Sequence, residues 1–165
     1  MKNTPVLFAL LLQFIASIAV ADGDLVVSGA WIRAAPPNAP VLAGYMTIEN
    51  HSRTSKSLVG AASPAFGDVT IHRTEHTDGV ARMTHLPSID IAAGGKLVLQ
   101  PDGYHLMLMQ PKRPLRTGDR VPIELRFADG SRTSALFAVR DRGAAHEDSG
   151  SHSDHKSMAH DRPAR

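Results

Sequence analysis

The chain has 165 residues, a formal net charge of +2 and no cysteine. Without cysteine it cannot supply a thiolate nucleophile, a zinc site with thiolate ligands or the thiolate of a blue-copper centre. The nearly balanced charge includes no basic stripe, which argues against a nucleic-acid partner. This length suits one domain with additional terminal segments.

Residues 1–21 predict a secretory signal peptide. Lys2 gives a short positive region, residues 5–20 are almost wholly apolar, and Ala19-Val20-Ala21 forms an A-x-A cleavage site before a polar residue. The alternative is an uncleaved membrane anchor, because the apolar run is nearly long enough to span a bilayer. The A-x-A ending favours cleavage after Ala21, so we expect an exported protein without a membrane attachment.

Residues 22–140 form the expected folded domain. No segment keeps a helical period for three turns, whereas short apolar or alternating runs recur between glycine, proline and aspartate residues. Several short strands at this spacing predict an all-β sandwich or barrel. The runs lie at 25–27, 31–32, 45–48, 69–72, 96–99, 104–109, 121–127 and 135–139.

Four residues in this domain have ligand types and a spacing that predict a metal site. His72, Met83, His105 and Met107 form the pattern H-x10-M-x21-H-x-M. Thioethers are soft, uncharged ligands, and their combination with imidazoles selects Cu(I) among the common biological metals. Each residue alone could be a core methionine or a surface histidine. As a spaced set they favour a Cu(I) site.

The turn Asp78-Gly79 predicts a two-residue β-hairpin. In that register His72 lies opposite His85 and diagonal to Met83, on one face of the hairpin. A four-residue loop would place His72 directly opposite Met83, and a three-residue loop would separate them. His85 could be an extra ligand, a neighbour of the site or only an exposed residue, and the sequence leaves this open.

His105 and Met107 share a face because they are two residues apart on a predicted strand. Leu106 and Leu108 then point the other way, into a core. The two His/Met pairs can meet at one metal only if the strand 104–109 lies beside the hairpin, which the alternation permits but does not show.

From about residue 141 the composition changes to histidine, serine and charged residues, with almost nothing large and apolar. Such a segment cannot bury a core, so we expect residues 141–165 to be disordered. A His-rich tract is typical of metal capture, and imidazoles suit Cu(II), zinc or nickel. The alternative is a solvated tail that binds no metal. The candidate ligands are His146, His152, His155, Met158 and His160.

The domain resembles the periplasmic copper chaperone family usually written PCu(A)C, whose motif is the same H-x10-M-x21-H-x-M. The likeness covers roughly residues 24–140 and extends beyond the four candidate ligands. The other similar segments are Trp31-Ile32-Arg33 and residues 45–50, 78–80, 93–95, 101–109, 114–115 and 118–119.

This resemblance implies a cupredoxin-like β-sandwich of Greek-key topology. It implies one Cu(I), held near the surface by His72, Met83, His105 and Met107. It also implies that the periplasmic protein delivers copper to respiratory cytochrome c oxidase, at the CuA centre of subunit II or, in some lineages, at other copper sites. Sco-type copper proteins would act in the same route.

Three other functions compete with copper delivery. An enzyme is not expected, because the sequence has no spaced carboxylate pair and no Ser-His-Asp constellation. An exported β-sandwich interaction module without a metal would leave the His/Met spacing as an accident. Copper buffering or resistance would use the same ligands, and the sequence does not separate it from delivery.

Overall fold

The computed structural model describes residues 24–141, which contain ten strands. They are β1 (Leu25–Arg33), β2 (Val41–Asn50), β3 (Lys56–Ala62), β4 (Asp68–Thr77), β5 (Val80–His85), β6 (Ile89–Ile91), β7 (Lys96–Leu99), β8 (Tyr104–Met109), β9 (Arg120–Phe127) and β10 (Arg132–Arg140). The predicted signal peptide and nearly all of the predicted tail lie outside the described residues. Between residues 24 and 141, no helix has the length and apolar character needed to cross a membrane.

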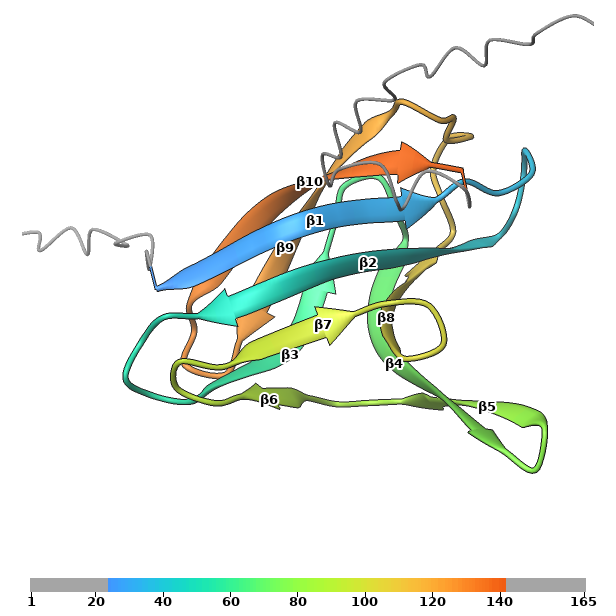
Figure 1. Ribbon diagram of the computed structural model, residues 1–165. Helices are drawn as coiled ribbons and strands as arrows, with labels where there is room; N and C mark the ends of the chain where they lie inside the picture. The colour runs from blue at the N-terminus through green and yellow to red at the C-terminus, as the bar shows by residue number, and fades with distance from the viewer. Residues whose placement is uncertain (1–23, 142–165) are drawn as a thin grey trace, which may run out of the picture.

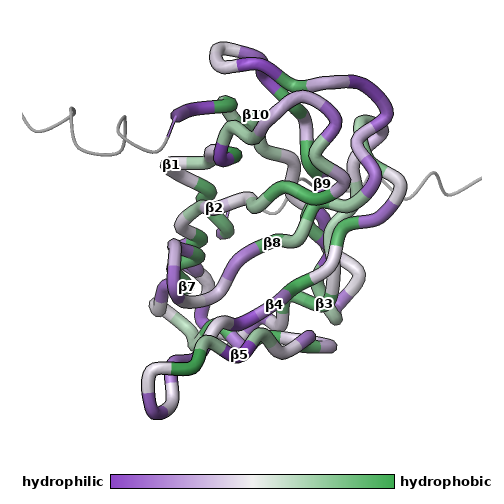
Figure 2. The backbone as a smooth tube through the Cα atoms, turned by 90° about the vertical axis from the view of Figure 1, so that its right-hand side faces the viewer, coloured by the Kyte–Doolittle hydropathy of each residue, from purple (hydrophilic) through white to green (hydrophobic). Residues whose placement is uncertain are grey.

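The strands form one continuous path in the order β5-β4-β8-β2-β1-β10-β9-β3-β6, with β7 paired to β2. Strands β1 and β10 pair in parallel, and the other pairs are antiparallel. The path curls, so that β1, β2 and β7 lie on one side of the domain and β3 and β9 on the other (Figures 1 and 2). The predicted all-β architecture is therefore confirmed.

The core lies between these layers and follows from the period-two alternation of the strands. In β9 the buried residues are Val121, Ile123, Leu125 and Phe127, each separated by a more polar residue. Strand β8 buries Leu106 and Leu108 in the same cluster. One face of each strand thus fills the core, which leaves the other face of β8 available for different side chains.

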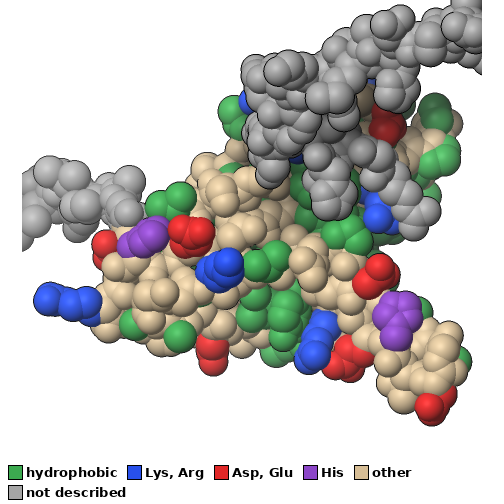
Figure 3. All heavy atoms as spheres, viewed as in Figure 1, with side chains coloured by type: hydrophobic (Ala, Val, Ile, Leu, Met, Phe, Trp, Pro, Cys, Tyr) green, Lys and Arg blue, Asp and Glu red, His purple; other side chains and the backbone are tan. Residues whose placement is uncertain are grey.

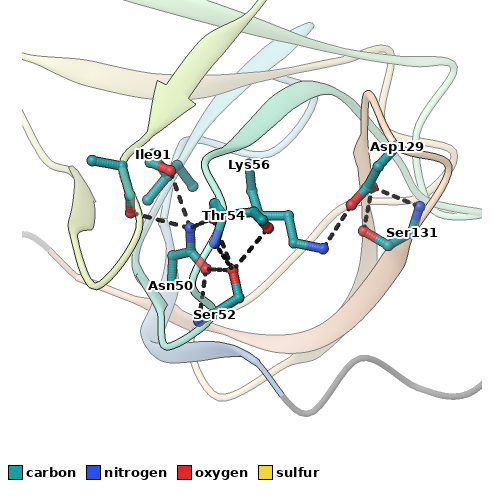
Figure 4. Close-up of polar contacts among 8 residues, drawn as sticks. Asn50, Ser52, Thr54, Lys56, Ile91, Asp129 and Ser131 are labelled. Carbon is teal, nitrogen blue, oxygen red and sulfur yellow. Dashed lines mark hydrogen bonds and ion pairs between the residues drawn. The ribbon is translucent and has the colours of Figure 1, made fainter.

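A polar cluster joins the loop after β2 to the neighbouring turns (Figure 4). The Asn50 side chain is 1% exposed, and its Nδ2 lies 2.9 Å from the carbonyl of Thr54, 3.1 Å from that of Ile91 and 3.1 Å from that of Ala92. Its Oδ1 accepts hydrogen bonds from the backbone and hydroxyl groups of Ser52. Asn50 thereby ties the β2 end to the segment after β6.

The same cluster contains an ion pair between Lys56 and Asp129. The Nζ atom of Lys56, whose residue is only 9% exposed, lies 2.6 Å from Oδ2 of Asp129. The other carboxylate oxygen of Asp129 accepts hydrogen bonds from the backbone and hydroxyl of Ser131. The hydrogen bond from Lys56 and those from Ser131 hold the pKa of Asp129 well below its usual range.

Candidate metal centre

The β4–β5 hairpin projects from one end of the domain (Figure 1). Asp78 and Gly79 form its turn with positive φ angles of 52° and 76°, as a two-residue turn of the primed type requires. His72 consequently pairs with His85, and Thr74 pairs with Met83. The register predicted from the two-residue turn is confirmed, and His72 and Met83 lie diagonally on one face.

Strand β8 lies on the other side of β4 from β5. His72 pairs with His105 across this junction, and Thr70 pairs with Met107. Directly paired residues of neighbouring strands point to the same face of a sheet. Strands β5, β4 and β8 therefore bring His72, Met83, His105 and Met107 to one face, as the motif requires for a common site.

This face is separate from the hydrophobic core. Leu106, between the two candidate ligands of β8, is fully buried with Ile71 in the core cluster. Met83, by contrast, is 53% exposed, so it is not a core methionine. Its exposure means that the thioether contributes little to the core and is accessible to a metal or a partner.

An open pocket of about 230 Å³ lies on this face, and Met83, His105 and Met107 line it together with Arg33 and Ala43. His105 is only 6% exposed, and Met107 is half-buried. The candidate ligands thus range from a buried imidazole to an exposed thioether. An ion held among them would be partly shielded from water but reachable from outside.

The orientation of the His105 ring follows from its backbone partner. Its Nδ1 lies 3.1 Å from the carbonyl oxygen of Gly103. A carbonyl only accepts hydrogen bonds, so Nδ1 carries the proton and donates it. The lone pair of Nε2 remains free for a metal ion. Such backbone partners typically fix the tautomer of metal-binding histidines.

The His72 ring has one satisfied and one unsatisfied nitrogen. Its Nε2 lies 3.0 Å from Oγ1 of Thr70, whereas its buried Nδ1 has no hydrogen-bond partner among the described residues. Buried polar atoms without partners are rare in proteins and cost free energy. In the tautomer whose Nε2–H donates to Oγ1 of Thr70, the lone pair of Nδ1 is free, and a bound metal ion would satisfy it.

The surroundings of His72 also keep it neutral. Burial lowers the pKa of this imidazole, and the neighbouring His105 and His85 lower it further. Its ring centre lies 5.9 Å from that of His105 and 5.4 Å from that of His85. Because a ligating histidine must be deprotonated, a lowered pKa favours metal binding near neutral pH.

The side chains available as ligands among the described residues limit which metal ions this face can bind. No group of three or more His, Asp or Glu side chains in residues 24–141 is arranged to hold a metal ion. In the observed side-chain orientations, a metal site on this face therefore has to include the thioethers. That requirement points to a soft ion and away from magnesium, calcium or a histidine-carboxylate zinc site.

Two residues of the site were not found from the sequence. Thr70 contacts His72, and its position two residues earlier on the same strand face could have indicated this. Arg33 lines the pocket, its guanidinium carbon lies 5.9 Å from the Tyr45 ring centre, and its buried Nε has no hydrogen-bond partner in the described part of the chain. Arg33 comes from β1, and its approach depends on pairing between distant segments.

Two other histidines lie beside carboxylates instead. His76 is 3.6 Å from Asp102, and His51 is 3.3 Å from Glu49, both at exposed positions. The predicted tail ligands His146, His152, His155, Met158 and His160 lie outside the described residues.

The fold and this face together define a small β-sandwich domain with two imidazoles and two thioethers on one open side. The family model described as "Putative lipoprotein LpqE-like" matches residues 25–139. A putative lipoprotein of Leifsonia xyli, Lxx21020, is 36% identical over 128 residues, which cover 77% of this chain and 75% of the relative. The chain belongs to the LpqE-like family.

Solved structures agree with this assignment. The solution structure of CuI-DR1885 from Deinococcus radiodurans is 40% identical, with a TM-score of 0.59, over 75% of this chain and 83% of that one. The copper-bound PCuAC domain from PmoF2 has a TM-score of 0.60 at 19% identity, covering 72% and 94% of the two chains. The cupredoxin-like β fold and the resemblance to PCuAC proteins are confirmed.

Proposed function

We propose that the protein is a copper chaperone that carries one Cu(I) on the β5-β4-β8 face. His72, Met83, His105 and Met107 would be its ligands. The observation that carries the proposal is the strand register, which turns all four side chains to one face outside the core. The solution structure of the D. radiodurans relative is that of its CuI form, which supports the choice of ion.

The ligand set suits transfer better than permanent retention. Two imidazoles and two thioethers are neutral, so a bound Cu(I) keeps its single positive charge, and no thiolate locks it in place. Met83 is exposed on an edge strand. A ligand of a recipient protein can therefore replace this thioether while the buried His105 still holds the ion. We propose copper transfer and not catalysis as the activity.

We further propose that the mature protein acts in the periplasm and delivers copper to cytochrome c oxidase subunit II, together with Sco-type proteins. The signal-like residues 1–21 and the family resemblance support this proposal. Copper buffering is the alternative use of the same site. A deletion strain grown at low copper separates the two functions. If the protein delivers copper, the deletion lowers oxidase activity, and added copper restores that activity. If the protein only buffers copper, oxidase activity does not fall.

Substituting the two thioethers tests the ligand assignment. Met83→Leu and Met107→Leu keep approximately the side-chain volume but remove the sulfur. We expect each to weaken Cu(I) binding in an anaerobic competition titration, without lowering the thermal unfolding midpoint. Met109→Leu is a matched control, because Met109 lies on the same face of β8 but outside the motif.

X-ray absorption on the Cu(I) form gives an independent result. The proposal expects two sulfur and two nitrogen neighbours in the parent protein, and one sulfur fewer in each variant. Parent-like Cu(I) affinity in both Met83→Leu and Met107→Leu would show that the ligand assignment is wrong.

A further inference from the structure

A third histidine extends the candidate site toward the edge of the sheet. His85 on β5 is the direct cross-strand partner of His72, and His105 on β8 is the partner of His72 on the other side. The three imidazoles therefore form one row across β5, β4 and β8, on the face that carries the two thioethers.

The spacing of this row is compatible with a shared metal ion. The ring centres of His72 and His85 lie 5.4 Å apart, and those of His72 and His105 lie 5.9 Å apart. Metal–nitrogen bonds of about 2.0–2.1 Å place the centres of two imidazoles on one ion roughly 4.5–6 Å apart. Each neighbouring pair in the row meets this condition. His85 and His105 flank His72 on opposite sides, so the three rings can share one ion only after the exposed His85 ring turns toward His105.

The third nitrogen ligand is not preformed. No group of three such side chains in residues 24–141 is already arranged around a metal position. His85 is nevertheless free to turn, because every residue of β5 is exposed and no hydrogen bond or ion pair within the described residues holds this ring. Rotation of an exposed side chain between rotamers requires little free energy.

The two oxidation states of copper make different demands on this face. Cu(I) is suited by thioethers, whereas Cu(II) prefers nitrogen and oxygen ligands in a tetragonal arrangement. His72 and His105 alone give Cu(II) two nitrogens, and thioethers are soft ligands that suit it poorly. His85 stands next to His72 at the solvent-exposed side, where water can fill the remaining positions.

We propose that His85 is a ligand specific to divalent copper. It joins His72 and His105 when this face holds Cu(II), and it takes no part in the Cu(I) site. The face then holds two overlapping sites that share two imidazoles, and the divalent ion lies closer to the sheet edge. This inference rests on the proposed function, since it uses His72 and His105 as copper ligands.

The test uses the full chain with the tail histidines replaced, so that they do not compete for Cu(II). The background variant carries asparagine at positions 146, 152, 155 and 160. His85→Asn is added to this background, and His76→Asn is the matched control, because His76 is an exposed histidine of the same hairpin that is paired with Asp102 instead. Aqueous copper(II) sulfate is the probe.

We expect the background protein to show three nitrogen ligands by electron paramagnetic resonance. His85→Asn should leave two, and it should lower Cu(II) affinity by at least about tenfold, the lower end of what loss of a partner around a metal causes. His76→Asn should change neither quantity. Anaerobic Cu(I) affinity should be the same in all three proteins.

Two results would overturn the inference: equal Cu(II) affinity and nitrogen count with and without His85, or an equal loss of Cu(I) and Cu(II) affinity in His85→Asn. Failure of the proposed function is a separate result. It would appear as absent Cu(I) binding in the background protein, whatever the Cu(II) data show.

Discussion

The polar cluster around Asn50 and the His/Met face show two opposite uses of polar atoms at the ends of strands. In the cluster, both the oxygen and the nitrogen of the Asn50 carboxamide have partners (Figure 4). On the His/Met face, Nδ1 of His72 and Nε of Arg33 are buried without a hydrogen-bond partner in the described part of the chain.

The difference indicates which region serves stability and which serves binding. Satisfied buried groups contribute to a single folded structure, whereas an unsatisfied group costs free energy until something binds it. The exposed side chains support the same division. Acidic and basic groups are interspersed over the part of the surface that Figure 3 draws in colour, and no large patch of one charge stands out in that view.

The largest effect on stability is expected from Asn50→Ala. This change leaves the buried carbonyl of Ile91 without its partner and opens the loop that Ser52 closes. Buried groups without partners cost about 1–3 kcal/mol each, so we expect a loss of about 2–4 kcal/mol in the free energy of unfolding. Urea denaturation measures it. Cu(I) affinity at the distant face should stay unchanged, and a loss of Cu(I) binding in folded Asn50→Ala would break the division between the regions.

His72→Leu should have the opposite effects on stability and on Cu(I) affinity. It removes the unsatisfied Nδ1 and replaces it with an apolar group, so the free energy of unfolding of the copper-free protein should stay the same or rise. Cu(I) affinity should fall by more than about 100-fold, because losing a ligand exceeds the roughly 10–100-fold loss typical for a partner of a ligand. Urea denaturation and competition titration measure the two quantities. His76→Leu is the control, and a marked destabilisation by His72→Leu alone would refute this description of the face.

Local signals in the sequence predicted the features of the His/Met face that depend on short segments, namely the hairpin register and the core-facing side of β8. Asp78-Gly79 set the hairpin register because a two-residue turn with positive φ angles allows one pairing. The alternation of Leu106 and Leu108 with the candidate ligands of β8 correctly assigned the core face. These features need no knowledge of distant contacts.

Other features depend on pairing between distant strands and could not be derived. The strand order placed β8 beside β4, and the parallel pairing of β1 with β10 joined the two layers. Strand β3 escaped prediction because its Gly60 and alanines give no clear alternation. Arg33 enters the pocket only through the pairing of β1 with β2 and of β2 with β8.

The smallest expected effect is a difference between the pH at which the His/Met face releases copper and the pH at which the polar cluster loses its contribution to stability. The pKa of His72 is lowered, so this ring stays neutral at pH 7, and its protonation should weaken Cu(I) affinity only as the pH falls below the usual imidazole value of about 6.5. The pKa of Asp129 is also lowered, which for a carboxylate means stability that is present above its unfolded value of about 3.9 and is lost as the pH falls further. Copper release should therefore begin at a higher pH than loss of stability.

Two titrations on the same protein check this order, one of Cu(I) affinity and one of the unfolding midpoint. Asp129→Asn should reduce the acid dependence of unfolding below about pH 4 only modestly, because the carboxylate is partly exposed and solvent weakens its pairing with Lys56. It should leave the pH dependence of Cu(I) binding as it was. Loss of stability and loss of copper over the same pH range would mean that the two regions are coupled, and that the His/Met face depends on the cluster at the other end of β2.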